Sequence, residues 1–145
     1  MKITMASLEI PEADTGTPHR PCVILAEDDR EMRMLVATTL RRDGWDVVEA
    51  SDGIDLLDCV AWMLHRAEDC GSCILLSDVR MPGMSGLQAL QQLRELGWPG
   101  EIILITAFGD DATHARAREL GARAVLDKPF DLDVLREAMQ RALGS

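Results

Sequence analysis

A chain of 145 residues is long enough for one domain with its own hydrophobic core, and we expect no second catalytic domain. Its 25 acidic residues against 15 Lys and Arg give a net charge of −10, which argues against direct binding of nucleic acid, because phosphate contacts need clustered basic side chains. The sequence has no apolar stretch long enough to span a bilayer and no signal-peptide core, so we expect a cytoplasmic protein with four free thiols.

Residues 1–21 hold three of the six prolines and show no apolar periodicity, which predicts a flexible N-terminal extension. From residue 22 onward, short aliphatic runs alternate five times with amphipathic stretches, a pattern typical of βα units on a parallel sheet. We therefore expect one domain over residues 22–145. The predicted strands lie at 23–26, 45–50, 74–78, 102–105 and 124–126.

The amphipathic stretches predict five helices, each with one buried apolar face at the helical period of 3.6 residues. The fourth helix, at 109–120, is rich in Ala and Arg and ends before Gly121. The predicted buried positions of the other four are Met32, Leu35, Val36, Thr39 and Leu40; Ile54, Leu57, Val60 or Ala61, and Leu64; Leu87, Leu90 and Leu93; and Leu132, Leu135, Ala138 or Met139, and Ala142.

Polar side chains stand at the C-terminal ends of four predicted strands. Glu27 and Asp28 follow the first strand and Asp78 ends the third. Thr106 follows the fourth strand and Lys128 the fifth. Because the C-terminal ends of parallel strands share one edge of the sheet, where ligands bind in open α/β folds, we expect these five side chains to converge.

Three neighbouring carboxylates repel one another unless a cation compensates them. Mg²⁺ suits this set because it prefers oxygen ligands, whereas zinc sites usually contain Cys or His. The hydroxyl of Thr106 and the ammonium of Lys128 complete an arrangement suited to phosphoryl transfer, which depends on positioning and neutralising the phosphoryl oxygens. The residues therefore indicate Asp78 as a phosphate acceptor with Mg²⁺ as cofactor.

Four motifs at these strand ends closely resemble the receiver domain of bacterial two-component response regulators, of the stand-alone chemotaxis-receiver type. They are VILAEDD at 23–29, LLSDVRMPGMSG at 75–86, ITA at 105–107 and DKPF at 127–130, and the likeness covers residues 22–143. The resemblance implies a flavodoxin-like (βα)5 three-layer sandwich with a parallel sheet of order 2-1-3-4-5. It also implies a phosphorylation-dependent signalling switch that is not an enzyme, beyond catalysing its own phosphoryl transfer and dephosphorylation.

The resemblance implies a role for each acidic residue. Asp78 would take the phosphoryl group from the phosphohistidine of a sensor histidine kinase or a phosphotransfer protein. Asp28 would bind Mg²⁺ directly and Glu27 through water, with Asp78 and the backbone carbonyl of Arg80 as further ligands.

The resemblance also assigns the remaining site residues and the output surface. Thr106 and Lys128 would contact the phosphoryl oxygens, and the Lys128–Pro129 peptide would be cis. Phosphorylation would then alter the face formed by the fourth helix, the fifth strand and the fifth helix, where a downstream protein effector binds.

Three positions are expected to modulate the switch. Arg80 and Phe108 stand where receivers vary the lifetime of the acyl phosphate. Val125 lies three residues before Lys128, where receivers often carry a Tyr or Phe that turns inward, so the usual aromatic switch is in doubt. The segment 62–73 also makes the second helix and its loop longer than is usual in the family, either as an insertion or as a partner surface.

Several alternatives remain open at this level. A haloacid-dehalogenase-like phosphatase needs a second Asp where Arg80 stands. A redox or metal role could involve Cys70 and Cys73, with Cys59 and His65, although a lone CxxC pair is weak evidence for zinc. A degenerate receiver used for docking, a fragment of a larger transcriptional regulator, and a monomer or weak homodimer are also compatible with the sequence.

Overall fold

The computed structural model describes residues 20–65, 73–81, 84–107 and 109–144, so the predicted extension at 1–21 lies almost wholly outside the described part. The described chain contains a sheet of five parallel strands in the order β2-β1-β3-β6-β7. In chain order this is 2-1-3-4-5, which confirms the predicted flavodoxin-like topology. The strands are β1 (Cys22–Ala26), β2 (Asp46–Ala50), β3 (Cys73–Asp78), β6 (Ile102–Thr106) and β7 (Ala124–Asp127).

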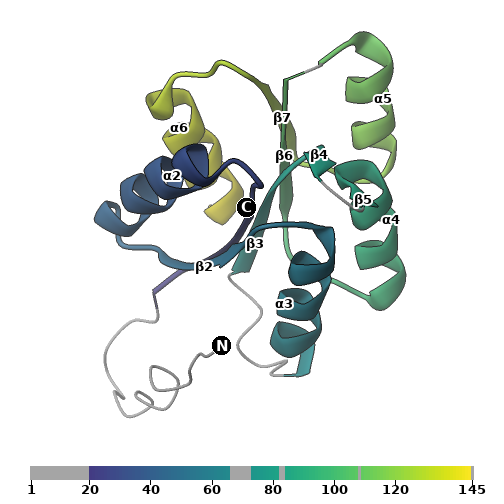
Figure 1. Cartoon of the computed structure of the whole chain (residues 1–145), viewed down its shortest axis with the longest axis horizontal. Helices are drawn as coiled ribbons and strands as arrows, with labels where there is room; N and C mark the ends of the chain where they lie inside the picture. The colour runs from purple at the N-terminus through teal and green to yellow at the C-terminus, as the bar shows by residue number, and fades with distance from the viewer. Residues whose placement is uncertain (1–19, 66–72, 82–83, 108, 145) are drawn as a thin grey trace.

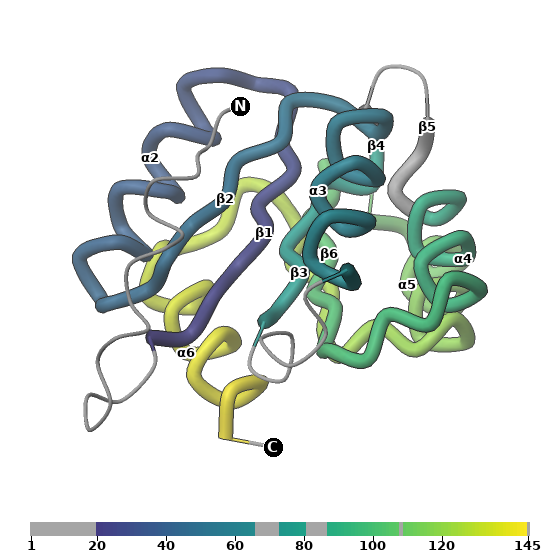
Figure 2. The backbone as a smooth tube through the Cα atoms, turned by 90° about the horizontal axis from the view of Figure 1, so that it is seen from below, coloured from purple at the N-terminus to yellow at the C-terminus, as the bar shows by residue number. Residues whose placement is uncertain are grey.

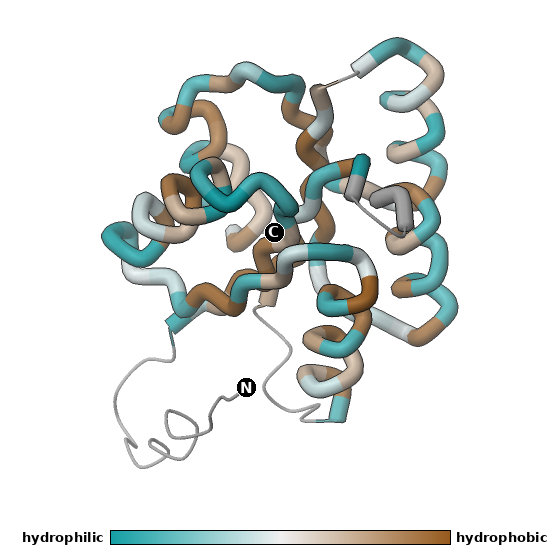
Figure 3. The backbone as a smooth tube through the Cα atoms, in the orientation of Figure 1, coloured by the Kyte–Doolittle hydropathy of each residue, from teal (hydrophilic) through white to brown (hydrophobic). Residues whose placement is uncertain are grey.

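Helices cover both faces of this sheet, as Figures 1 and 2 show. One face packs against α2 (Arg30–Arg42) and α6 (Leu132–Leu143). The other packs against α3 (Gly53–His65), α4 (Gly86–Leu96) and α5 (Asp111–Glu119). Alternate residues of each strand point into one or the other of two apolar layers, which explains why the strands are among the most hydrophobic segments in Figure 3. The result is a three-layer sandwich.

Aspartates begin several of the helices directly after a strand end. The Asp29 carboxylate accepts hydrogen bonds from the backbone N–H groups of Glu31 and Met32 at the start of α2. Asp110 and Asp131 cap α5 and α6 in the same way. These caps turn the chain sharply at the C-terminal edge of the sheet, so the residues between strand and helix stay at that edge.

The structure corrects two predicted helix faces. Leu35 was expected to be buried, but it is 49% exposed, and Ala37 takes its place in the core beside Val36 and Leu40. On α3 the prediction is wrong for Ile54, which is 66% exposed, and is confirmed for Val60, which is buried. Leu57 and Leu64 are partly buried against the core, and Leu56 and Met63 are further buried side chains of this helix.

A short antiparallel pair follows β3, where the sequence predicted only a turn. It joins β4 (Arg80–Met81) to β5 (Met84–Ser85). The predicted long second helix ends at His65, and the loop after it lies outside the described residues. None of the helices in the described part of the chain combines the length and the apolar character that a membrane span requires.

Candidate functional site

The acidic pair after β1 is held in place through its backbone. Glu27 continues the strand by donating its backbone N–H to the carbonyl of Ala50 at 3.1 Å. Its own carbonyl accepts a 2.8 Å hydrogen bond from the guanidinium of Arg33 on α2. The side chain of Glu27 is buried, at 1% exposed, whereas that of Asp28 is exposed. The pair therefore offers one enclosed carboxylate and one that is open to solvent.

Asp78 ends β3 in the middle of the sheet and is 5% exposed. Its Oδ1 accepts a hydrogen bond from the backbone N–H of Arg80 at 2.9 Å, and its Oδ2 accepts one from Nζ of Lys128 at 2.6 Å. The next residue, Val79, donates its backbone N–H to the carbonyl of Ile105 at 2.7 Å. Strand pairing therefore continues beyond Asp78 and leaves its carboxylate in a fixed position at the sheet edge.

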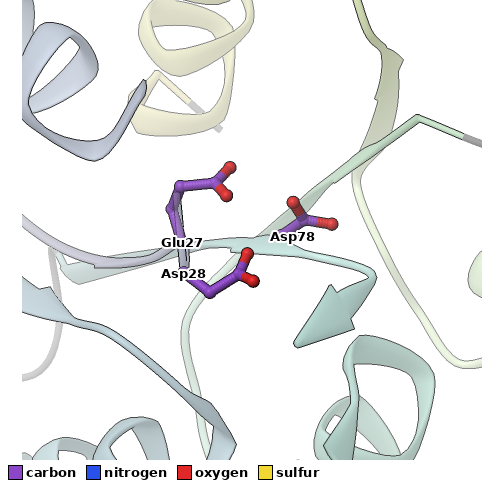
Figure 4. A group of neighbouring side chains, drawn as sticks. All are labelled: Glu27, Asp28 and Asp78. Carbon is purple, nitrogen blue, oxygen red and sulfur yellow. The ribbon is translucent and has the colours of Figure 1, made fainter. Parts of the chain in front are cut away.

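The carboxylates of Glu27, Asp28 and Asp78 meet at this edge, as Figure 4 shows. One oxygen from each lies within 4.8 Å of the others. Oxygen ligands of one octahedral Mg²⁺ stand about 3 to 4 Å apart, given metal–oxygen distances of about 2.1 Å. Only small side-chain adjustments would therefore let these groups share an ion, and the exposed Asp28 leaves the position open to water and phosphate.

Lys128 links the two buried carboxylates of the cluster. Its Nζ donates to Oε1 of Glu27 at 2.9 Å and to Oδ2 of Asp78 at 2.6 Å. Its backbone N–H donates to the carbonyl of Thr106 at 2.7 Å, and the Lys128–Pro129 peptide is cis, as expected. Burial by itself would lower the pKa of Lys128, but the hydrogen bonds with Asp78 and Glu27 outweigh it and raise the pKa above its usual value. The lysine is therefore a permanent cation at neutral pH.

Burial raises the pKa of Glu27 above its usual value, and the nearby charge of Asp78 adds to this shift. The hydrogen bonds from Lys128 and from the backbone N–H of Asp29 oppose it without cancelling it. When all three acids are ionised, three negative charges face one ammonium group, which leaves two charges uncompensated. A divalent cation would neutralise them.

Thr106 and Val125 lie on the neighbouring strands β6 and β7. Thr106 is buried at the end of β6, opposite Asp127 in the strand register, and Val125 is half-buried in β7. Arg80 places its backbone N–H on Asp78, while the use of its carbonyl as a metal ligand stays a prediction. Phe108 lies outside the described residues.

Sequence reasoning missed two groups of residues beside the site. Arg33 joins the carbonyl of Glu27 to the carboxylate of Glu49, at 2.8 and 3.2 Å respectively. His114 on α5 lies 2.9 Å from the carboxylate of Asp127. Neither pair could be found from strand-end position, because a helical residue reaches the site only when the rotation of its helix is known.

The cysteines in the described part of the chain form no metal-binding group, and a role of the Cys70–Cys73 pair stays a prediction. Cys59 is half-buried on α3, and burial, with the nearby Asp55 and Asp58, raises the pKa of its thiol to about 11. Cys73 is buried in β3, and Cys70 lies outside the described residues. Among the described residues, the His, Cys, Asp or Glu side chains that lie close enough together to share a metal ion are those of the acidic cluster, Glu27, Asp28 and Asp78.

Known proteins resemble the chain in sequence and in fold. Sporulation initiation phosphotransferase F of Bacillus subtilis is 27% identical over 83% of this chain and 92% of its own length. The C4-dicarboxylate transport transcriptional regulatory protein DctD of Pseudomonas aeruginosa is 34% identical over 83% of this chain, which spans only 25% of that regulator. The structure of the chemotaxis response regulator CheY4 of Vibrio cholerae is 26% identical, with a TM-score of 0.71 over 86% of this chain and 100% of that one.

The sequence also matches the response regulator receiver domain as a family, over residues 23–140. This range contains all five strands of the sheet except the first residue of β1, together with the acidic cluster and Lys128. The chain therefore belongs to the response regulator receiver domain family.

Proposed function

We propose that this chain is a phosphorylation-dependent signalling switch in which Asp78 accepts a phosphoryl group from the phosphohistidine of a sensor histidine kinase or a phosphotransfer protein. In this step a carboxylate oxygen of Asp78 attacks phosphorus, the phosphorus–nitrogen bond breaks, and the histidine ring keeps the electron pair and takes up a proton. The observation that carries the proposal is the position of Asp78: a buried strand-end carboxylate hydrogen-bonded to Lys128 and flanked by Glu27 and Asp28.

The neighbouring residues divide the work of neutralising the phosphoryl oxygens. Glu27, Asp28 and Asp78 would hold Mg²⁺, which when bound supplies positive charge to those oxygens. Lys128 already donates a hydrogen bond to the Asp78 carboxylate, and its ammonium group would form an ion pair with the phosphoryl group after transfer. Thr106, at the end of the neighbouring strand, would donate its hydroxyl to another phosphoryl oxygen. Asp78 is thus consumed when it is phosphorylated and regenerated when water hydrolyses the acyl phosphate.

The proposed output is a change in the face formed by α5, β7 and α6. Thr106 pairs with Asp127 across the sheet, and its carbonyl accepts the backbone N–H of Lys128. A shift of Thr106 toward a phosphoryl group would therefore act directly on β7. This supports a downstream protein effector at that face, and the likeness to part of a transcriptional regulator also fits a receiver that works as one module of a longer protein.

Intact-mass spectrometry after incubation with acetyl phosphate tests the proposal. Wild type should gain one phosphoryl group, about 80 Da, in the presence of Mg²⁺ and not in EDTA. Asp78→Asn should lose this adduct. Asp46→Asn is the matched control, because Asp46 is an exposed carboxylate at the opposite end of the sheet, and this variant should be labelled like wild type.

Two results would contradict the proposal. An adduct that persists in Asp78→Asn would place the acceptor elsewhere. No adduct on folded wild type, with Mg²⁺ present, would favour a degenerate receiver that serves as a docking module.

A further inference from the structure

We propose that His114 and Asp127 form a latch that holds Gly109 against the end of β7, and so restrains the phosphorylation site in its resting arrangement. The latch concerns the regulation of the proposed switch and rests on that function. The two residues are positioning residues, because they act on the site through Thr106 and Lys128.

The latch is a contact between a helix, a strand end and a glycine. His114, in the second turn of α5, donates its Nε2–H to Oδ1 of Asp127 at 2.9 Å. A Cβ atom built on Gly109 would coincide with the Asp127 carboxylate and lie 2.9 Å from Nε2 of His114. The carboxylate and the imidazole therefore lie directly on the backbone of Gly109, and a larger residue there would have to displace them.

Backbone bonds connect the latch to the site residues. Asp127 is the register partner of Thr106 in the parallel pair β6–β7. The residue after it, Lys128, donates its backbone N–H to the Thr106 carbonyl and its side chain to Asp78. Gly109 follows Thr106 by three positions, so we expect the contacts of Asp127 and His114 with Gly109 to resist a movement of Thr106 toward Asp78.

The packing of α5 makes this polar contact important. Ala117 is the buried residue of α5, whereas α2, α3 and α6 each bury at least three. With little apolar surface to fix α5, the His114–Asp127 hydrogen bond contributes a larger share of what holds the helix to β7.

The latch predicts that its loss makes the switch easier to operate. His114→Ala should raise the initial rate of labelling by acetyl phosphate about two- to fivefold, which is the range expected for loss of one partly exposed polar pair. Gly109→Ala should have the same effect, because the added methyl group would displace the Asp127 carboxylate from His114. His114→Gln keeps a donor and should restore most of the wild-type rate.

Two controls separate positioning from general loosening. Arg116→Ala changes an exposed residue of the same helix that forms an ion pair with Glu119, one turn away, so this variant should be labelled like wild type. The affinity for Mg²⁺, measured by calorimetry, should stay unchanged in the latch variants, because the acidic residues directly follow β1 or end β3 and do not contact His114 or Gly109.

The outcomes distinguish the latch from the function on which it rests. Rates of His114→Ala and Gly109→Ala equal to or below wild type, or a parallel loss of Mg²⁺ affinity, would overturn the latch while leaving Asp78 as acceptor. Failure of wild type to be labelled would instead overturn the proposed function and the latch with it.

Discussion

Cys59 shows how its neighbours set the chemistry of a single residue. It lies half-buried on α3, where Asp55 is one turn before it and Asp58 directly precedes it. Burial is the largest cause of its raised pKa, and the two carboxylates add to it, so the thiol has a pKa of about 11. A thiol that stays protonated at neutral pH is a poor nucleophile and a poor metal ligand.

We therefore expect slow alkylation of Cys59 by iodoacetamide at pH 7.5 to 9 in the folded protein, with a rate that rises about tenfold for each pH unit. The tryptic peptide 43–66 contains Cys59 as its single cysteine, so mass spectrometry can follow this site alone. The same protein in urea provides the control and should react faster at each pH. Rapid labelling in the folded state near pH 7 would reveal an activated thiol and revive the redox alternative.

Strand-end position was enough to predict that four of the five expected side chains meet at the site. Glu27, Asp28 and Asp78 lie together, and Lys128 binds two of them, because parallel strands bring their C-terminal ends to one edge. Their roles in phosphoryl transfer stay predictions. Residues on helices that support the site, such as Arg33, were missed. Their contribution depends on the rotation of the helix about its own axis, which the sequence does not give.

At the scale of elements, Arg33 joins α2 to both neighbouring strands. Its guanidinium donates to the Glu27 carbonyl after β1 and to the Glu49 carboxylate in β2. Arg41, on the same helix, binds the other oxygen of Glu49 at 3.1 Å and the carbonyl of Val47, but not Glu27. The two arginines therefore differ in whether they reach the acidic pair.

Arg33→Met should lower the free energy of unfolding by about 1–2 kcal/mol, because the Glu27 carbonyl loses a charged donor in a largely buried place. It should also weaken Mg²⁺ binding, since Glu27 and Asp28 are no longer held from the helix side. Urea denaturation and calorimetric titration measure the two effects. Arg41→Met is the matched variant and should keep the Mg²⁺ affinity of wild type; equal losses in both variants would contradict a specific role for Arg33.

The sequence predicted where helices form more securely than which face of each helix is buried. The apolar stripe of α6 is regular, and its predicted members Leu135 and Ala142 are buried. The sequence of α3 is apolar on almost every side, with Ile54 and Trp62 exposed in the structure, so periodicity allowed more than one face. The fit of α3 against β1, β2 and α4 selects one of these faces. The β4–β5 pair was missed for a related reason, because its strands have only two residues each.

At the scale of the whole molecule, the acidic cluster brings three of the 25 acidic residues together in a chain whose net charge is −10. The pKa values of Lys128 and Glu27 are both raised, but at neutral pH the first shift stabilises the folded chain and the second destabilises it. The raised pKa of Lys128 contributes stability that is present below pH 10.5 and is lost as the pH rises through the raised value. The raised pKa of Glu27 contributes stability that is fully present below pH 4.5 and is lost as the pH rises through the raised value, so at neutral pH its ionised form opposes folding.

Mg²⁺ should relieve this cost and stabilise the folded chain. Binding to the native state alone adds about 2.7 kcal/mol to the free energy of unfolding when the ion is present at about 100 times its dissociation constant. We expect the thermal unfolding midpoint at pH 7 to rise by several degrees with MgCl₂, and by much less with NaCl of equal ionic strength. Asp28→Asn should lose this response, whereas Asp46→Asn, which removes one negative charge outside the cluster, should keep it. A response that is the same in both variants would mean that Mg²⁺ acts by screening the total charge and not by binding at Glu27, Asp28 and Asp78.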